Sequence, residues 1–146
     1  MIKIYCSIGD ILGQIDKAKL IDLSNDDTYP MEDGEGNPVV NTENVEKAIE
    51  AAASEIDSYA SVRHKVPFSP VPPIITKLAV DIAIYNLFSR KYTGVEEDNI
   101  IRRYKNAVKV LERMAEGKVM IGASEETIFH SSPQKAFGDQ FRKEYD

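Results

Sequence analysis

Few residues in this chain have the types and spacing that enzyme chemistry needs. The two histidines, His64 and His130, have no Cys or His neighbour at zinc-site spacing. The single cysteine, Cys6, has no nucleophile signature around it. The sequence also lacks a G-x-S-x-G elbow, a phosphate-binding G-x-x-x-x-G-K loop and a G-x-G-x-x-G motif. We therefore expect no catalytic residues and no cofactor, and the sequence favours a protein that is not an enzyme.

An acidic segment that contains glycine offers weak candidates for metal ligands. Counted from Asp33, the stretch DGEGNPVVN places Asp33, Glu35 and Asn37 at the first, third and fifth positions of a calcium-loop template. However, Pro38 stands where the template needs its turn glycine, and Asn44 replaces the bidentate glutamate. A solvated acidic loop is therefore the favoured interpretation, and we expect no bound metal.

Asp81 is a carboxylate within the most apolar segment of the chain. A charge buried there is costly unless it is paired. A catalytic carboxylate is one interpretation, but no second carboxylate or base lies near it in a convincing pattern. We expect instead a structural, buried polar residue that is paired with Arg63, with Arg90 or with a backbone N–H.

Aromatic residues recur every four positions near the C-terminus, at Phe137, Phe141 and Tyr145, with Arg142 and Lys143 beside them. This spacing predicts one face of a short helix. Such a face could dock on another protein or pack back on the chain's own core, and the sequence leaves both open. Phe137, Phe141, Arg142 and Tyr145 are the candidate partner-binding residues.

The segment 42–63 predicts an amphipathic helix, because its apolar residues recur every three or four positions. Asn41 or Thr42 is expected to cap it. Its charged residues are expected mostly away from the apolar face: Glu46, Lys47, Glu50, Glu55 and Asp57.

Two short helices are expected before this long one. Ser7 can cap a helix that ends at Leu12, with Asp10 in its first turn, and Asp16 can cap a second. Between them and the long helix, the segment 24–41 is rich in Asp, Asn, Gly and Pro, and it predicts a long acidic loop.

Four of the seven prolines form a hinge after the long helix: Pro67, Pro70, Pro72 and Pro73. Proline cannot occupy a helix interior, but Pro73 suits a first turn. We expect the hinge to turn the chain rigidly into a helix over 74–88. This helix is apolar on most of its circumference, as buried helices are. Recognition of the prolines as a polyproline ligand is disfavoured, since the fixed turn already explains them.

A third long helix is expected after a capping box formed by Thr93 and Glu96, and Gly117 is placed to end it. Its outer face is basic: Arg102, Arg103, Lys105, Lys109 and Arg113. The fold class predicted is therefore all-α, a small bundle of three main helices with short N-terminal helices and a long acidic loop. We expect this domain to cover 1–122 and an extended, mobile tail to cover 123–146.

The composition fits one globular domain, with 42% hydrophobic and 29% charged residues among 146. A net charge of −6 disfavours general nucleic-acid binding. A single cysteine suits a reducing cytosol. The apolar segment 74–88 is too short and, with Lys77 and Asp81, too polar to span a bilayer, and the N-terminus has no signal-peptide pattern. We expect no membrane association.

The segment 54–87, SEIDSYASVRHKVPFSPVPPIITKLAVDIAIYNL, resembles the central signature of Mu-like prophage proteins of the phage neck. Other pieces match in order: "Y-S--D" at the start, the acidic loop, "GK--IG" after the last helix and "F---F" in the tail. Family members often carry a fuller "D-D-DG" series in the loop, so this departure weakens any metal role that the resemblance could imply.

The resemblance implies a subunit of the head–tail connector, or a head-completion protein, that forms a homo-oligomeric ring beneath the portal protein. Other neck and tail proteins would be further partners, and DNA would pass through an acidic lumen without specific binding. The chain would be in the bacterial host cytoplasm before assembly and in the virion neck afterwards. The alternative is a cytosolic helical adaptor or regulatory domain that binds a protein partner.

Overall fold

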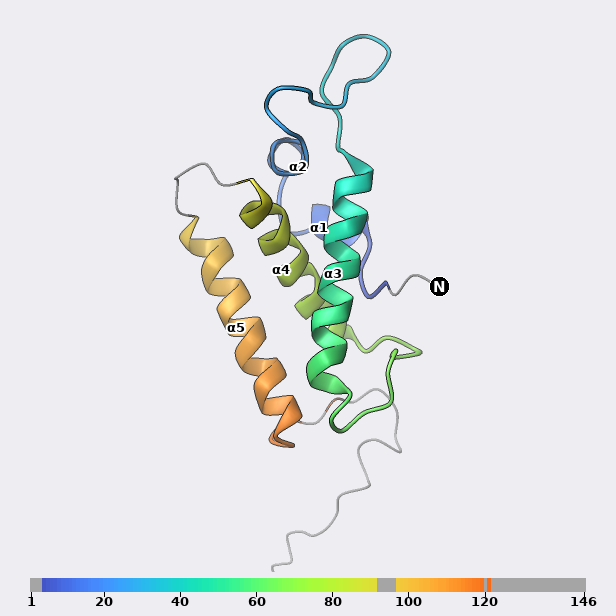
Figure 1. Ribbon diagram of the computed structural model, residues 1–146, viewed down its shortest axis with the longest axis vertical. Coiled ribbons are helices and arrows are strands. Elements are labelled where there is room, and N and C mark those ends of the chain that lie inside the picture. Colours follow the sequence, from blue (N-terminus) through green and yellow to red (C-terminus); the bar gives the residue numbers. More distant parts are fainter. Residues whose placement is uncertain (1–3, 92–96, 120, 122–146) are drawn as a thin grey trace, which may run out of the picture.

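The computed structural model describes residues 4–91, 97–119 and 121. Over these residues the chain is helical and contains no strand, so the all-α prediction is confirmed (Figure 1). The helices are α1 (Ile8–Leu12), α2 (Lys17–Ser24), α3 (Thr42–Ala60), α4 (Pro73–Arg90) and α5 (Asp98–Ala115).

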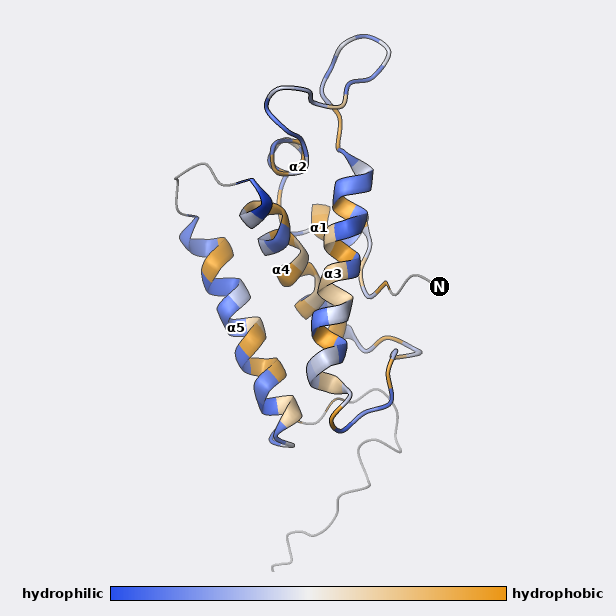
Figure 2. Ribbon diagram, in the orientation of Figure 1, coloured by the Kyte–Doolittle hydropathy of each residue, from blue (hydrophilic) through white to orange (hydrophobic). Residues whose placement is uncertain are grey.

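Helix α4 lies between α3 and α5 and packs against both (Figure 1). It runs opposite to them, while α3 and α5 run in the same direction. Its all-round apolar sequence buries nearly every turn, as predicted: Ile75, Leu78, Ala79, Val80, Ile82, Ala83, Ile84 and Leu87. Ile74 differs, since it is 37% exposed in the first turn. The apolar side of α5 faces this core and its polar side faces outward (Figure 2).

The short N-terminal helices begin where the sequence predicts. Ser7 and Asp10 form a reciprocal capping box at α1, with the Asp10 N–H donating to Ser7 Oγ at 3.1 Å. Asp16 caps α2 by accepting from the Lys19 N–H at 2.8 Å, and Asn41 caps α3. These local side-chain bonds satisfy N–H groups that a helix start leaves unpaired.

The proline hinge delivers the chain into α4 as predicted. Pro72 is the N-cap of α4 and Pro73 its first residue, where the missing N–H costs nothing. Pro67 and Pro70 lie in the exposed turn before it. Phe68 between them is buried, and its ring lies 5.9 Å from that of Tyr5. The hinge is therefore anchored on the core.

Helix α5 begins later than the sequence predicts. Its first residue is Asp98, and Glu97 before it has non-helical backbone angles and makes no capping bond. The predicted start at Thr93 is therefore wrong, although Thr93 and Glu96 themselves lie outside the described residues. Glu97 instead pairs with Lys19 of α2 at 3.0 Å, a contact that a local capping pattern cannot reveal. The end of the helix, with Gly117 at φ +80°, follows the prediction.

Two further predictions concern membrane spanning and the C-terminal tail. None of the helices in the described ranges is long and apolar enough to cross a membrane. The tail predicted over 123–146, with Phe137, Phe141, Arg142 and Tyr145, lies outside the described residues. The division at residue 122 therefore stays a prediction.

Candidate functional site

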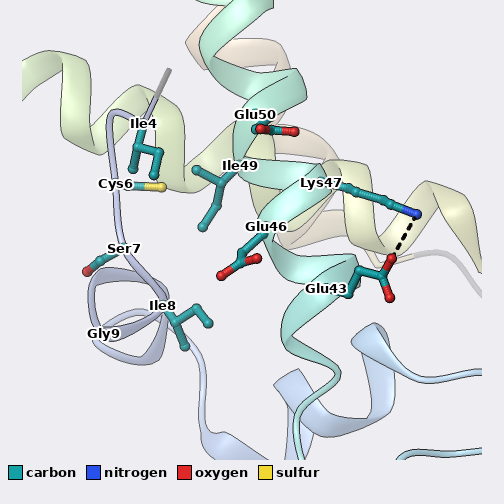
Figure 3. Close-up of a pocket in the computed structure, with 10 residues that line it drawn as sticks. All are labelled: Ile4, Cys6, Ser7, Ile8, Gly9, Glu43, Glu46, Lys47, Ile49 and Glu50. Atoms are coloured by element: carbon teal, nitrogen blue, oxygen red, sulfur yellow. Dashed lines mark ion pairs between the residues drawn. The ribbon is translucent and has the colours of Figure 1, made fainter. Parts of the chain in front are cut away.

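A groove of about 620 Å³ lies between the N-terminal segment and α3 (Figure 3). Its floor is largely apolar, and its α3 rim carries three carboxylates. It is lined by Ile4, Cys6, Ser7, Ile8, Gly9, Glu43, Glu46, Lys47, Ile49 and Glu50. Ile4 remains 56% exposed. A concave apolar surface with a charged rim is suited to binding a partner that combines apolar and basic groups.

The one thiol in this groove is not prepared for chemistry. Cys6 is buried, and burial followed by the nearby charge of Asp10 raises the pKa of its thiol to about 12. Since the thiolate is the nucleophilic form, Cys6 is neutral and inert at physiological pH. The groove therefore offers shape and charge for contact.

A buried hydroxyl holds the N-terminal wall of the groove in place. Tyr5 Oη donates to Asp57 Oδ1 at 2.6 Å and accepts from the Phe68 N–H at 3.0 Å. Burial, and then the bond to Asp57, raises the pKa of Tyr5 to about 12, so the hydroxyl keeps its proton. The bond ties the N-terminal segment to both α3 and the proline hinge.

The burial of Asp57 differs from what the sequence predicts. Asp57 was predicted on the polar face of the long helix, yet it is 6% exposed and lies within the core. The physical reason is the hydrogen bond from Tyr5, which makes a buried carboxylate acceptable there. The sequence signal that could have indicated this is its spacing, four residues after Ala53 and three before Ala60, both of which are buried.

Asp81 is buried, at 3% exposure, and lies beside two cations. Its carboxylate is 2.8 Å from Lys77 Nζ and 3.7 Å from Arg103 Nε. The partners predicted from sequence, Arg63 and Arg90, are wrong. Lys77 is one turn away on the same helix, and Arg103 reaches across from α5.

The two arginines named from sequence have other structural roles. Arg63 Nε donates to the Ala115 carbonyl at 2.9 Å and so caps the C-terminal end of α5. Arg90 pairs with Asp26 at 2.7 Å, at the start of the long loop. Both cations therefore fix chain segments that are far away in sequence.

The long loop between α2 and α3 is held firmly at its base. Asn25 is 3% exposed, and its side chain donates to the Val39 carbonyl at 2.7 Å and accepts from the Met31 N–H at 2.8 Å. Lys91 adds an ion pair of 2.9 Å to Asp27. These bonds close the two ends of the loop on each other and on the end of α4.

Beyond this base the loop projects from the end of the bundle (Figure 1). Tyr29 is 86% exposed and Met31 is 50% exposed. Apolar side chains are more stable when buried against other apolar surface than when exposed to water. A projecting loop that presents two large ones is therefore a candidate contact surface.

The weak metal candidates lie in the turn of this loop. Asp33 Oδ1 accepts from the Glu35 N–H at 2.8 Å and from the Asn37 N–H at 3.0 Å. These backbone bonds, that of Asn37 first, lower the pKa of Asp33. Within the described parts of the chain, no three His, Cys, Asp or Glu side chains are grouped to hold a metal ion. The structure thus uses Asp33 to shape a turn, and the absence of metal binding stays a prediction.

The chain matches the family described as "Bacteriophage Mu, Gp36" over residues 5–137. It is also similar to the "Mu-like prophage FluMu protein gp36" of Haemophilus influenzae (strain ATCC 51907 / DSM 11121 / KW20 / Rd), with 30% identity over 82 residues. That match covers 56% of this chain and 55% of the relative, so it spans about half the length of each. The family match covers most of the chain and confirms the resemblance to Mu-like prophage proteins. The chain belongs to the bacteriophage Mu Gp36 family.

Proposed function

We propose that this chain is a structural subunit of the phage neck. It joins other copies in a head–tail connector ring, which docks beneath the portal protein and completes the DNA-filled head. The support is membership of a bacteriophage Mu family, together with the resemblance of residues 54–87 to a signature of neck proteins. In this role the chain supplies contact surfaces and carries out no reaction.

The observation that carries the proposal is the projecting loop with its fixed base. Asn25 and Lys91 order the loop before any partner arrives, so little conformational entropy remains to be lost on binding. Burying a large apolar side chain contributes roughly 1.5–3 kcal/mol. Tyr29 and Met31 would therefore contribute to anchoring a subunit on the portal or on a neighbouring neck protein.

The charge of the chain suits a ring through which DNA passes. The net charge is −6, and the loop contributes five carboxylates: Asp26, Asp27, Glu32, Asp33 and Glu35. Like charge opposes binding to phosphate, so an acidic lumen lets the duplex slide without adhering. The chain acts in the virion neck after assembly and is made in the host cytoplasm before it.

The test is co-expression of the chain with the portal protein of the same prophage. We expect the two to sediment together and negative-stain images to show added density beneath the portal. Tyr29→Ala with Met31→Ala should weaken this attachment about tenfold or more. The matched control is Val62→Ala, because Val62 is 64% exposed but lies just beyond the opposite end of α3.

Two outcomes separate the proposal from its alternative. Loss of attachment in the loop variant, with the control unchanged, supports a connector that docks through the loop. A wild-type chain that neither self-associates nor binds the portal contradicts the proposal and favours the cytosolic adaptor.

A further inference from the structure

Two helices of the bundle carry oppositely charged rows with identical spacing. On α3 the row is Glu43, Glu46 and Glu50, and on α5 it is Arg102, Lys105 and Lys109. Each row follows the pattern i, i+3, i+7, which spans about 10.5 Å along a helix. Five of the six side chains are exposed and Glu50 is half-buried.

The two rows point away from each other, on opposite sides of the molecule. The α5 row lies opposite the buried stripe of that helix, which includes Leu111 and Met114. The α3 row lies on the rim of the groove, whereas the side of α3 that meets α5 carries Glu55, which accepts from Tyr104 Oη at 2.9 Å. Figure 1 shows α5 and the N-terminal segment on opposite sides of α3 and α4.

The charges in these rows have few partners of their own. Within the described residues, Glu46, Glu50, Lys105 and Lys109 make no ion pair. Glu43 has one loose, exposed contact with Lys47 at 3.6 Å, and Arg102 donates to the Asn99 amide oxygen. Both rows are therefore available to pair with charges on another molecule.

The direction of the helices makes the rows complementary between copies. Since α3 and α5 run the same way, a neighbouring copy can place its α5 alongside this α3 with both helices pointing in the same direction. Tyr104 of α5 contacts Glu55 of α3, so Arg102 is level with about residue 53, and the α5 row lies roughly 15 Å farther along the bundle than the α3 row. A neighbour shifted by that distance brings Glu43 to Arg102, Glu46 to Lys105 and Glu50 to Lys109. A contact between two different faces closes into a ring when the ring axis is inclined to the helices, because the incline supplies the shift between neighbours.

The groove suits the long cationic side chains of such a partner. Its apolar floor includes Ile8 and Ile49, which lie inside the carboxylate rim (Figure 3). Lysine and arginine stems cover apolar surface while their charged ends stay at its edge. The stems of Lys105 and Lys109 therefore match the floor, and their ammonium groups match the rim.

We propose that the α3 groove of one copy receives the basic α5 row of a second copy, and that this head-to-tail contact builds the neck ring. The proposal rests on the proposed function, because it names the surface through which the subunits of that ring meet. It concerns a different surface from the loop, which contacts the portal.

Charge exchange tests this contact. Glu46→Lys with Glu50→Lys, or Lys105→Glu with Lys109→Glu, makes both faces alike in charge, so each variant alone should self-associate about tenfold more weakly or worse in sedimentation equilibrium. Mixing the two variants, or combining all four changes in one chain, restores opposite charges and should restore association. The control for the second variant is Lys17→Glu with Lys65→Glu, which changes the net charge equally at exposed positions elsewhere.

A cross-link gives a second readout. Carbodiimide treatment of a mixture of ordinary and isotope-labelled chains, alone and with the portal, should join Glu46 or Glu50 of one copy to Lys105 or Lys109 of another. The inference is overturned if neither double variant weakens self-association, or if mixing the two variants does not restore it. Cross-links that join the groove only to the tail or to other residues would also overturn it. If portal attachment persists in either case, the proposed function stands and only this contact is wrong.

Discussion

The hydroxyl of Tyr5 donates a 2.6 Å hydrogen bond to the carboxylate of Asp57, 52 positions later in the chain. The same oxygen accepts from the Phe68 N–H. Three segments therefore meet at one atom: the N-terminal wall of the groove, helix α3 and the proline hinge. The shape of the groove and the path into α4 depend on the same buried hydroxyl.

Tyr5→Phe should lower the free energy of unfolding by about 1–3 kcal/mol, because the Phe68 N–H loses its acceptor in a buried place. Urea denaturation followed by circular dichroism measures this. Tyr29→Phe is the matched control, since Tyr29 is 86% exposed, and it should leave stability unchanged. A Tyr5→Phe protein as stable as the parent would show that the network does not hold the fold.

Gly117 and Gly36 form a natural pair for a second prediction. Both have φ near +80°, where a side chain is strained, but their surroundings differ. A Cβ at Gly117 would lie 2.8 Å from Arg63 Cζ, whereas a Cβ at Gly36 meets nothing within 4 Å. Gly36→Ala should cost about 1 kcal/mol, from backbone strain alone.

Gly117→Ala should cost more than Gly36→Ala, because it also pushes Arg63 away from the carbonyls at the end of α5. Thermal unfolding of the two variants gives the comparison. The extra destabilisation by Gly117→Ala should disappear when both glycine variants are made in an Arg63→Ala background. Equal costs in the parent background would contradict a capping role for Arg63.

Asp81→Ala should destabilise the fold more than Asp81→Asn, because the amide retains part of the polar contact with Lys77. The cost of Asp81→Ala is expected at about 1–3 kcal/mol, limited because Lys77 is 65% exposed and stays hydrated. The control is Lys47→Ala, which breaks an exposed ion pair and should change little. Variants of Asp81 that unfold like the parent would exclude a structural role.

The features that sequence predicted correctly are those that depend on near neighbours. The caps at Ser7, Asp16 and Asn41 each join residues three positions apart, so the local pattern contains both partners. The buried helix α4 and its proline start follow from composition and from the fixed φ of Pro73. Such signals are readable before any tertiary contact is known.

The features that it missed depend on segments brought together by folding. The burial of Asp57 is not predicted by the sequence, because its partner Tyr5 belongs to another segment. The partners of Asp81 were misassigned because Arg103 lies on a helix whose packing against α4 no periodicity reveals. The groove has the same origin, since its two walls are the N-terminal segment and α3.

His64 should make stability fall in mild acid. Burial, and then the nearby charge of Arg63, lowers the pKa of His64 below its ordinary value of 6.5. As pH falls through about 6.5, the unfolded chain therefore takes up the proton before the folded chain does, and the free energy of unfolding falls. This loss of stability ends once the pH is below the folded-state pKa of His64. The urea midpoint should be lower at pH 5.5 than at pH 7.5, and His64→Gln should reduce this difference. A pH dependence that is unchanged in His64→Gln would assign it to other groups.

Removal of residues 123–146 should separate portal attachment from folding. The last described residue, Ile121, is fully buried, so a chain that ends at residue 122 keeps the core, and its helicity and melting should match the parent. The deleted sequence holds Phe137, Phe141 and Tyr145, and burying each on a partner would contribute roughly 1.5–3 kcal/mol. We expect the shortened chain to lose portal attachment in co-sedimentation while it still self-associates through α3 and α5.

Replacing the three aromatic residues by alanine in the full chain should give the same result, which links the effect to the stripe and not to chain length. A shortened chain that still binds the portal would remove the tail from the interface, and one that fails to fold would place the tail in the core.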